Sequence, residues 1–227
     1  MSKIGTFEDF KLFAKDKVGV DENILNKTMN PQSLITPYVL EERQLNVAAY
    51  DIFSRMMLDR IIFLSGTISE TSMDTIVAQM LYLDSVDKRD INLYINSGGG
   101  SCYDGLELIS VMNFIGSKVS TTILGMAASM AAVIASSGEK GKRFALPYSR
   151  FMIHQPLSNF GYSKFTDSKI ALQEMESVRN DLYQILSNNC GKSMDEVVQM
   201  CENGDTWMKP QQAIETGFID AIITNKE

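Results

Sequence analysis

Two residues of this sequence have the types and the setting for covalent catalysis. His154 is the only histidine of the chain, and it follows the apolar run RFMI, where a strand gives way to a loop. A hydrolase that attacks with a serine needs a base, and that base is most often an imidazole. Ser129 lies in the small-residue stretch GMAASMAA, which lets a substrate backbone come close. The pair predicts a serine nucleophile with a histidine base, while a structural histidine and a helix-capping serine remain alternatives.

Backbone amides are expected on both sides of Ser129. The chain bends at Gly125, and a buried helix over 129–136 would offer free amides and a dipole to a developing negative charge. The glycine-rich loop Asn96–Ser101 follows a predicted strand and could point further amides at a ligand. Phosphate binding is a rival for this loop, but no lysine follows and the glycines do not match GxGxxG. The loop is therefore interpreted as an oxyanion or substrate-strand cradle, with a ligand-free turn as the alternative.

An acid is needed to orient the imidazole, and the residues alone do not choose it. Asp205 has a local case, because it falls between a helix and the short apolar run TWM. Asp220 is interpreted as an exposed turn or strand residue. The candidate aspartates that follow His154 are Asp167, Asp181, Asp195, Asp205 and Asp220.

The elements that must position these residues alternate between strands and helices. Strands are predicted at 60–66, 91–95 and 118–123, separated by helical stripes within 73–81 and 106–115. This rhythm predicts an α/β fold with mainly parallel strands and right-handed crossovers. Two short strands, 143–146 and 150–154, and a long helix over 163–189 follow. A capping box at Ser193 and Glu196 opens another helix, and the last helix is predicted to start at Pro210 and to end at Gly217.

Composition limits the classes of protein to consider. The 227 residues are 44% hydrophobic and 22% charged, which suits one globular core. A net charge of −7 without a basic run argues against nucleic acid and against an anionic membrane as partners. Three cysteines without a CxxC pair predict neither a disulfide framework nor a metal site. The apolar stretch 123–135 is too short to span a bilayer, and no export signal is recognised, so a cytoplasmic location is expected.

Several motifs together strongly resemble the proteolytic subunits of the Clp protease family (ClpP), from about Pro37 to Thr224. They are SGTI, INSGGGS, GMAASMAA, KGKRFALPYSRFMIHQPL and QAIETGFIDAII. The resemblance implies a crotonase-like α/β fold of repeated ββα units with a protruding long helix, and no cofactor. It also implies a Ser129, His154 and Asp205 triad, with the backbone amides of Gly100 and Met130 as oxyanion donors.

The resemblance further implies a domain plan and an assembly. Residues 1–33 would be a propeptide or flexible extension, and residues 34–227 the peptidase domain. Within that domain, 34–48 would form the axial loop and 163–189 the ring-stacking helix. Two stacked heptameric rings would enclose the serines and degrade short peptides alone, and folded proteins with a Clp-family AAA+ ATPase. Tyr94 resembles an aromatic residue of the family's ATPase-docking cleft, while its neighbouring equivalent is Asn92.

Two departures from the family pattern bear on function. Gly98 stands where the family has a proline, which should loosen the glycine loop. Gly204 stands where many relatives have an arginine that helps to couple the rings. Either departure could misalign the triad, so a ring subunit with a silent site is kept as one alternative. Acyl-CoA chemistry is the other, because the crotonase fold also places amides around an oxyanion but uses glutamates for proton transfer. Labelling of Ser129 by a fluorophosphonate separates both from a peptidase.

Overall fold

The computed structural model describes residues 38–43, 46–158 and 164–224, which fall into two units, 1–59 and 60–227. In the first unit, β1 (Tyr38–Arg43) and β2 (Asn46–Asp51) form an antiparallel hairpin, and α3 (Ile52–Leu58) follows. The Asp51 carboxylate caps α3 by accepting hydrogen bonds from two backbone amides. The predicted propeptide lies outside the described residues. The described part of the predicted axial loop is a hairpin arm.

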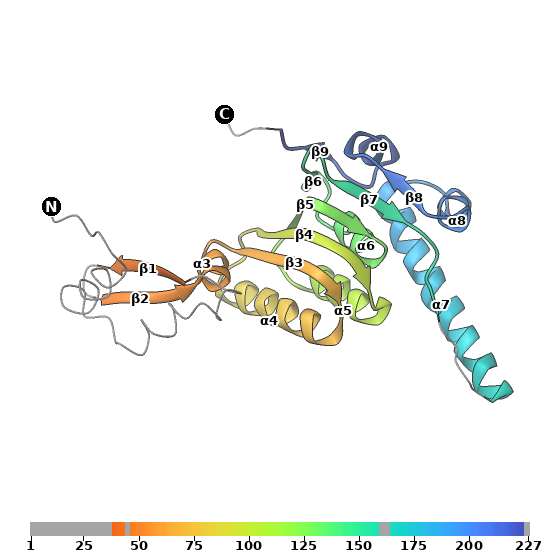
Figure 1. Ribbon diagram of the computed structural model, residues 1–227, viewed down its shortest axis with the longest axis horizontal. Helices are drawn as coiled ribbons and strands as arrows, with labels where there is room; N and C mark the ends of the chain where they lie inside the picture. The colour runs from red at the N-terminus through yellow and green to blue at the C-terminus, as the bar shows by residue number, and fades with distance from the viewer. Residues whose placement is uncertain (1–37, 44–45, 159–163, 225–227) are drawn as a thin grey trace, which may run out of the picture. The chain divides into compact units, whose positions relative to one another are not determined.

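The second unit is built on a seven-stranded sheet (Figure 1). Its main path runs β3-β4-β5-β6-β9 with parallel pairing, while β7 pairs parallel with β5 and antiparallel with β8. This confirms the predicted α/β fold with mainly parallel strands. The strands are β3 (Ile61–Ile68), β4 (Ile91–Gly100), β5 (Val119–Ala128), β6 (Arg143–Ala145), β7 (Arg150–Ile153), β8 (Thr206–Met208) and β9 (Ala221–Ile222).

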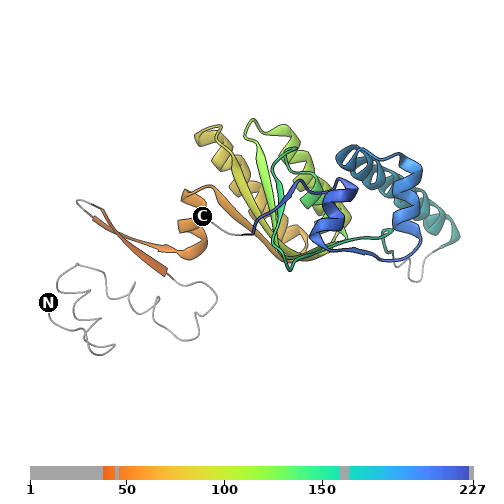
Figure 2. The same ribbon diagram turned by 90° about the horizontal axis from the view of Figure 1, so that it is seen from above.

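Helices cover one face of this sheet (Figures 1 and 2). Side chains alternate along each strand, so that Ile62 and Leu64 of β3 are buried on the helical side while Phe63 faces the other way. The helical periodicity of the sequence places Met73 and Met80 against them. The helices are α4 (Glu70–Val86), α5 (Cys102–Phe114), α6 (Met130–Ser136), α7 (Phe165–Cys190), α8 (Met194–Glu202) and α9 (Pro210–Thr216).

The predicted helix boundaries are confirmed where the sequence carries capping residues. Ser193 and Glu196 form the predicted capping box of α8, and Pro210 is the first residue of α9. Gly217 ends α9 at a φ of 93°, and a Cβ there would lie 2.5 Å from the Cys190 carbonyl oxygen. Both the conformation and the close approach require glycine. None of the described helices has both the length and the apolarity needed to cross a membrane.

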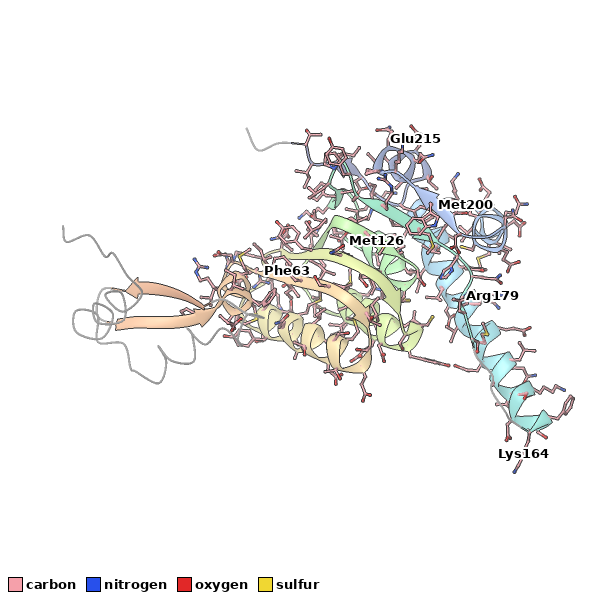
Figure 3. The ribbon with its side chains drawn as sticks, viewed as in Figure 1. Phe63, Met126, Lys164, Arg179, Met200 and Glu215 are labelled. Atoms are coloured by element: carbon pink, nitrogen blue, oxygen red, sulfur yellow. The ribbon has the colours of Figure 1, made fainter. Side chains whose placement is uncertain are left out.

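The long helix α7 has two different halves. Its buried residues lie in the C-terminal half and include Val178, Leu182 and Leu186. The N-terminal half extends away from the sheet, with Lys164 marking its far end (Figure 3). Phe165 and Ile170 of that half are 86% and 61% exposed. The first half of α7 therefore presents apolar side chains that this unit does not cover.

The glycine-rich segment is not the loop that the sequence predicted. β4 continues as an extended strand to Gly100, with Gly99 and Gly100 in register with Thr67 and Ile68 of β3. The Ser97 hydroxyl donates to the Gly66 carbonyl and accepts from the Gly99 amide at 3.0 Å. The buried Ser97 side chain therefore fixes the glycine-rich segment against β3, next to the exposed Gly98.

Candidate active site

The register of β5 places Ser129 next to the C-terminal end of β7. β5 pairs with β6 up to Ile123 and with β7 from Met126, and its ladder with β4 is interrupted between the two. The interruption coincides with the predicted bend at Gly125. In the last pair, Ala128 lies opposite Met152, and the Ser129 amide donates to the Met152 carbonyl at 2.9 Å. Ser129 is thereby fixed beside the end of β7.

Ser129 itself forms a sharp turn between strand and helix. Its backbone has φ 56° and ψ −129°, a combination that residues with a side chain rarely adopt. A turn of this kind between a strand and a helix projects the side chain away from the backbone. The Ser129 hydroxyl makes no capping hydrogen bond to α6. The alternative of a serine that only caps a helix is therefore wrong.

His154 follows β7 and meets Ser129 directly. Its Nε2 lies 2.8 Å from the Ser129 Oγ, and its side chain is only 15% exposed. A neutral imidazole whose Nε2 is unprotonated can accept the serine proton at this distance. The predicted pair is thus within hydrogen-bonding reach, as a nucleophile and its base must be.

Asp205 reaches the other nitrogen of the same ring. The last pair of the β7–β8 ladder is Ile153 with Thr206, so the next residues, His154 and Asp205, emerge opposite each other. The Asp205 Oδ1 lies 3.3 Å from the His154 Nδ1. A carboxylate here favours the tautomer that carries its proton on Nδ1, which leaves Nε2 free to accept. The Asp205 side chain is 57% exposed, which makes it the most exposed of Ser129, His154 and Asp205.

Asp220 lies at a bend directly before β9, but it is less exposed than the sequence predicts. It is 19% exposed rather than open to solvent, and it forms a salt bridge of 2.7 Å with the buried Arg143. It also accepts hydrogen bonds from the amides of Gly141 and Arg143. Burial opposes its ionisation, but the Arg143 guanidinium and these amides outweigh burial and hold the pKa of Asp220 below its ordinary value. Asp220 is a structural carboxylate that ties the start of β9 to β6.

Two glycines of β4 lie where the backbone is closely packed, and Gly99 borders Ser129 and the start of α6. A Cβ on Gly99 would lie 2.8 Å from the Ser129 Cβ and 3.1 Å from the Met130 backbone nitrogen. A Cβ on Gly100 would lie 2.2 Å from the Ile68 carbonyl oxygen. Gly99 is not among the site residues predicted from the sequence, although the run of three glycines signals that more than one close approach is needed. Gly99 therefore leaves no room for a side chain beside Ser129 and the Met130 amide.

A small cavity opens beside the Ser129 hydroxyl. Its volume is about 20 Å³, which suffices for about one water molecule. The side chains that line it are mostly apolar and include Cys102, Met130, Val133, Ile153, Leu182 and Leu186. A substrate side chain enters only if these walls move apart.

The thiol on the wall of this cavity is not a competing nucleophile. Burial raises the pKa of Cys102, which keeps it as a neutral thiol near pH 7. Cys102, Cys190 and Cys201 are all free. Ser129 is therefore the group that the histidine can activate.

Tyr94 lies on the opposite side of the sheet from the helices. Its ring is half-buried, and its centroid is 5.6 Å from that of Phe63 on β3, which Figure 3 labels. Asn92 lies two residues earlier on the same face of β4. These three residues form a small aromatic and polar patch, and the docking role of Tyr94 stays a prediction.

Comparison with known proteins shows the family of this chain. The profile of the Clp protease family matches residues 43–226. An ATP-dependent Clp protease proteolytic subunit of Bacteroides fragilis is 45% identical over 96% of this chain and all of its own length. The corresponding subunit of Porphyromonas gingivalis is 46% identical over 95% of this chain and 97% of its own. One from Streptococcus salivarius is 46% identical over 84% and 98%. The chain therefore belongs to the Clp protease family.

Proposed function

We propose that this chain is a serine endopeptidase subunit that cleaves peptide bonds of unfolded proteins with a Ser129, His154 and Asp205 triad. The observation that carries the proposal is the distance of 2.8 Å between the His154 Nε2 and the Ser129 Oγ. Membership of the Clp protease family supports it independently. Acyl-CoA chemistry loses its support, because a serine activated by an imidazole has no use in a glutamate-based proton transfer.

The reaction follows from the order of the three side chains. The Ser129 Oγ attacks the scissile carbonyl while the His154 Nε2 takes the hydroxyl proton. The Asp205 carboxylate accepts a hydrogen bond from the His154 Nδ1–H and stabilises the imidazolium that forms. His154 then donates its proton to the leaving amine, which frees the first product. Water repeats the same steps on the acyl-enzyme and releases the second product.

The tetrahedral oxyanion is assigned to backbone amides of two segments. Met130 opens α6, where amide groups are without helical partners, and Gly100 ends β4. The close approach of Gly99 to Ser129 and to the Met130 nitrogen supports an amide cradle at this place. Donors that are fixed before the reaction stabilise the developing charge most effectively.

The assembly and its partner are also part of the proposal. The relatives carry the name ATP-dependent Clp protease proteolytic subunit. We assign two stacked heptameric rings joined by α7, whose exposed Phe165 and Ile170 are suited to burial against other subunits. A Clp-family AAA+ ATPase would dock near Tyr94 and feed unfolded chains to the cytoplasmic barrel. Residues 1–33 are assigned as a propeptide, and 34–48 as the axial loop.

A silent ring subunit stays a second candidate because of one observation. The cavity beside Ser129 has room for about one water molecule, so it admits no substrate side chain as it stands. A subunit that never opens this cavity would build the barrel without cutting.

The test compares the full-length parent with Ser129→Ala and His154→Ala. We expect the parent to take up a fluorophosphonate at Ser129 and to hydrolyse short fluorogenic peptides. Both variants should lose hydrolysis by about 10³-fold or more. Size-exclusion chromatography controls for assembly. Hydrolysis by Ser129→Ala at the parental rate would refute the nucleophile, and an assembled parent without labelling would identify the silent subunit.

A further inference from the structure

A second, larger cavity adjoins the candidate active site. Its volume is about 670 Å³, which is enough for side chains of a bound peptide. It shares Cys102 and Pro156 with the small cavity at Ser129, so the two are neighbours around the same walls. One side is formed by Gly100 and the residues after it, and the other by 156–158. Its floor is formed by α7 between Asp167 and Val178.

The larger cavity carries negative charge on its α7 side. Asp167 and Glu174 both line it, and its described lining residues include neither lysine nor arginine. The Tyr103 hydroxyl donates to the Glu174 Oε1 at 3.3 Å, which holds this carboxylate on the side facing α5. We call this cavity the acidic groove. Its two carboxylates and its apolar floor of Ala171, Met175 and Val178 suit a long aliphatic side chain that ends in a cation.

We propose that the acidic groove selects peptide substrates that carry a lysine or arginine close to the scissile bond, with Glu174 as the main determinant and Asp167 as its support. The inference rests on the proposed function, because it takes Ser129 as the point of cleavage. An extended peptide advances about 3.3 Å per residue, so a side chain within a few residues of the bond reaches the adjoining groove. Charge complementarity of this kind directs binding and orientation.

The experiment uses quenched fluorescent peptides that differ at one position. Lysine or glutamine is placed in turn at each of three positions on either side of the cleavage point, because glutamine removes the charge and keeps a similar length. The full-length protein, Glu174→Gln and Asp167→Asn are compared. Glu176→Gln is the matched control, since it makes the same change on an exposed part of α7 outside the groove lining.

We expect at least one position where lysine raises kcat/KM about three- to fivefold over glutamine, the size expected of an exposed ion pair. Glu174→Gln should remove most of this ratio through KM, while Glu176→Gln should keep it. The ratio should also shrink at high salt, because the groove is open to solvent. A parent without preference for lysine at any position overturns the inference. An equal loss in Glu176→Gln overturns it too, because the preference would then come from the general negative charge.

A binding measurement keeps the two proposals apart. The Ser129→Ala protein should bind labelled peptides without cutting them. The fluorescence anisotropy of these peptides then reports the preference for lysine in binding alone. If the lysine and glutamine peptides are cut equally well at every position, the proposal for the acidic groove is refuted and the peptidase function stands. If Ser129→Ala binds lysine peptides selectively and loses this selectivity on Glu174→Gln, while the parent cuts no peptide, the peptidase is refuted and the groove is supported.

Discussion

Two segments supply the outer members of the proposed triad, and they are held in different ways. The junction between β5 and α6, which carries Ser129, runs through buried residues: Ala127, Ala128, Met130 and Ala131 are at most 2% exposed. The connection between α8 and β8, which carries Asp205, is exposed, and Gly204 at a φ of 108° has open space around its missing side chain. The position of the nucleophile is set by core packing. The position of the acid is set at the surface.

Few contacts hold the acid segment. The Thr206 hydroxyl donates to the Met200 carbonyl, and the Gln155 amide donates to the Cys201 carbonyl at 3.0 Å. An ion pair of 3.4 Å between Arg179 and Glu202 links α7 to the end of α8, in the region where Figure 3 labels Arg179 and Met200. The comparison predicts that changes in the buried segment act strongly and that changes in the acid segment act weakly.

Among changes that leave the three triad side chains in place, the largest effect is expected from Gly99→Ala, with Gly204→Ala as its matched partner. The new Cβ at Gly99 would push into Ser129 and the Met130 amide, so we expect kcat to fall about 10²- to 10³-fold. At Gly204 the side chain meets no atom, and only its φ costs about 1 kcal/mol. Peptide hydrolysis and thermal unfolding measure both. Similar losses of kcat in the two variants would contradict the comparison.

Removal of the acid should matter less than in enzymes that bury it. We expect Asp205→Ala to lower kcat/KM about 10²-fold, against about 10⁴ for a buried triad aspartate, because water can replace an exposed carboxylate at Nδ1. Peptide hydrolysis by Ser129→Ala serves as the reference. A loss as deep as that of Ser129→Ala would show that Asp205 is held more firmly than its exposure indicates.

Asp220 offers the opposite case, an aspartate that stabilises and takes no part in the chemistry. Asp220→Asn leaves the buried Arg143 without its counter-charge, so the free energy of unfolding should fall by about 2–3 kcal/mol at pH 7. Because its pKa lies below the ordinary value near 4, the stabilisation is complete above that value and is lost as pH falls through the folded-state pKa. Urea unfolding of parent and variant at pH 7 and pH 3 measures this. A difference that persists unchanged at pH 3 would contradict it.

The smallest effect is expected at the ion pair between α7 and α8. Arg179 and Glu202 are each almost two-fifths exposed, so Glu202→Gln should change the free energy of unfolding by about 0.5 kcal/mol or less. We expect kcat/KM to stay within about twofold of the parent. A larger loss of activity without a loss of stability would mean that α7 controls the position of Asp205.

Most of the fold was readable from the sequence because periodicity and capping residues report local structure. The alternation of strands and helices, the capping box at Ser193 and the stop at Gly217 are confirmed. The glycine run predicts a loop because glycine favours turns locally, but this prediction is wrong, since β4 pairs with β3 all the way to Gly100. This pairing joins residues far apart in sequence, so no local sequence pattern reports it.

The site was readable only in part, for a related reason. The single histidine and the small residues around Ser129 pointed to the first pair, and the family resemblance then selected Asp205. The residues alone did not choose it, because the choice depends on the antiparallel register of β8 on β7. Asp220 was misjudged because its partner Arg143 lies 77 residues away in sequence. The close approach of Gly99 to Ser129 likewise depends on two strands that meet only in the folded chain.

The backbone angles of Ser129 have a consequence for how this protein loses activity. A residue with a side chain in such a conformation stores about 1–3 kcal/mol of strain, which glycine would largely avoid. The packed alanines of α6 and the hydrogen bond from the Ser129 amide to the Met152 carbonyl keep the turn from relaxing. If heat or denaturant loosens this packing, the turn relaxes first and the hydroxyl leaves the imidazole. Catalysis should then fail before the sheet unfolds.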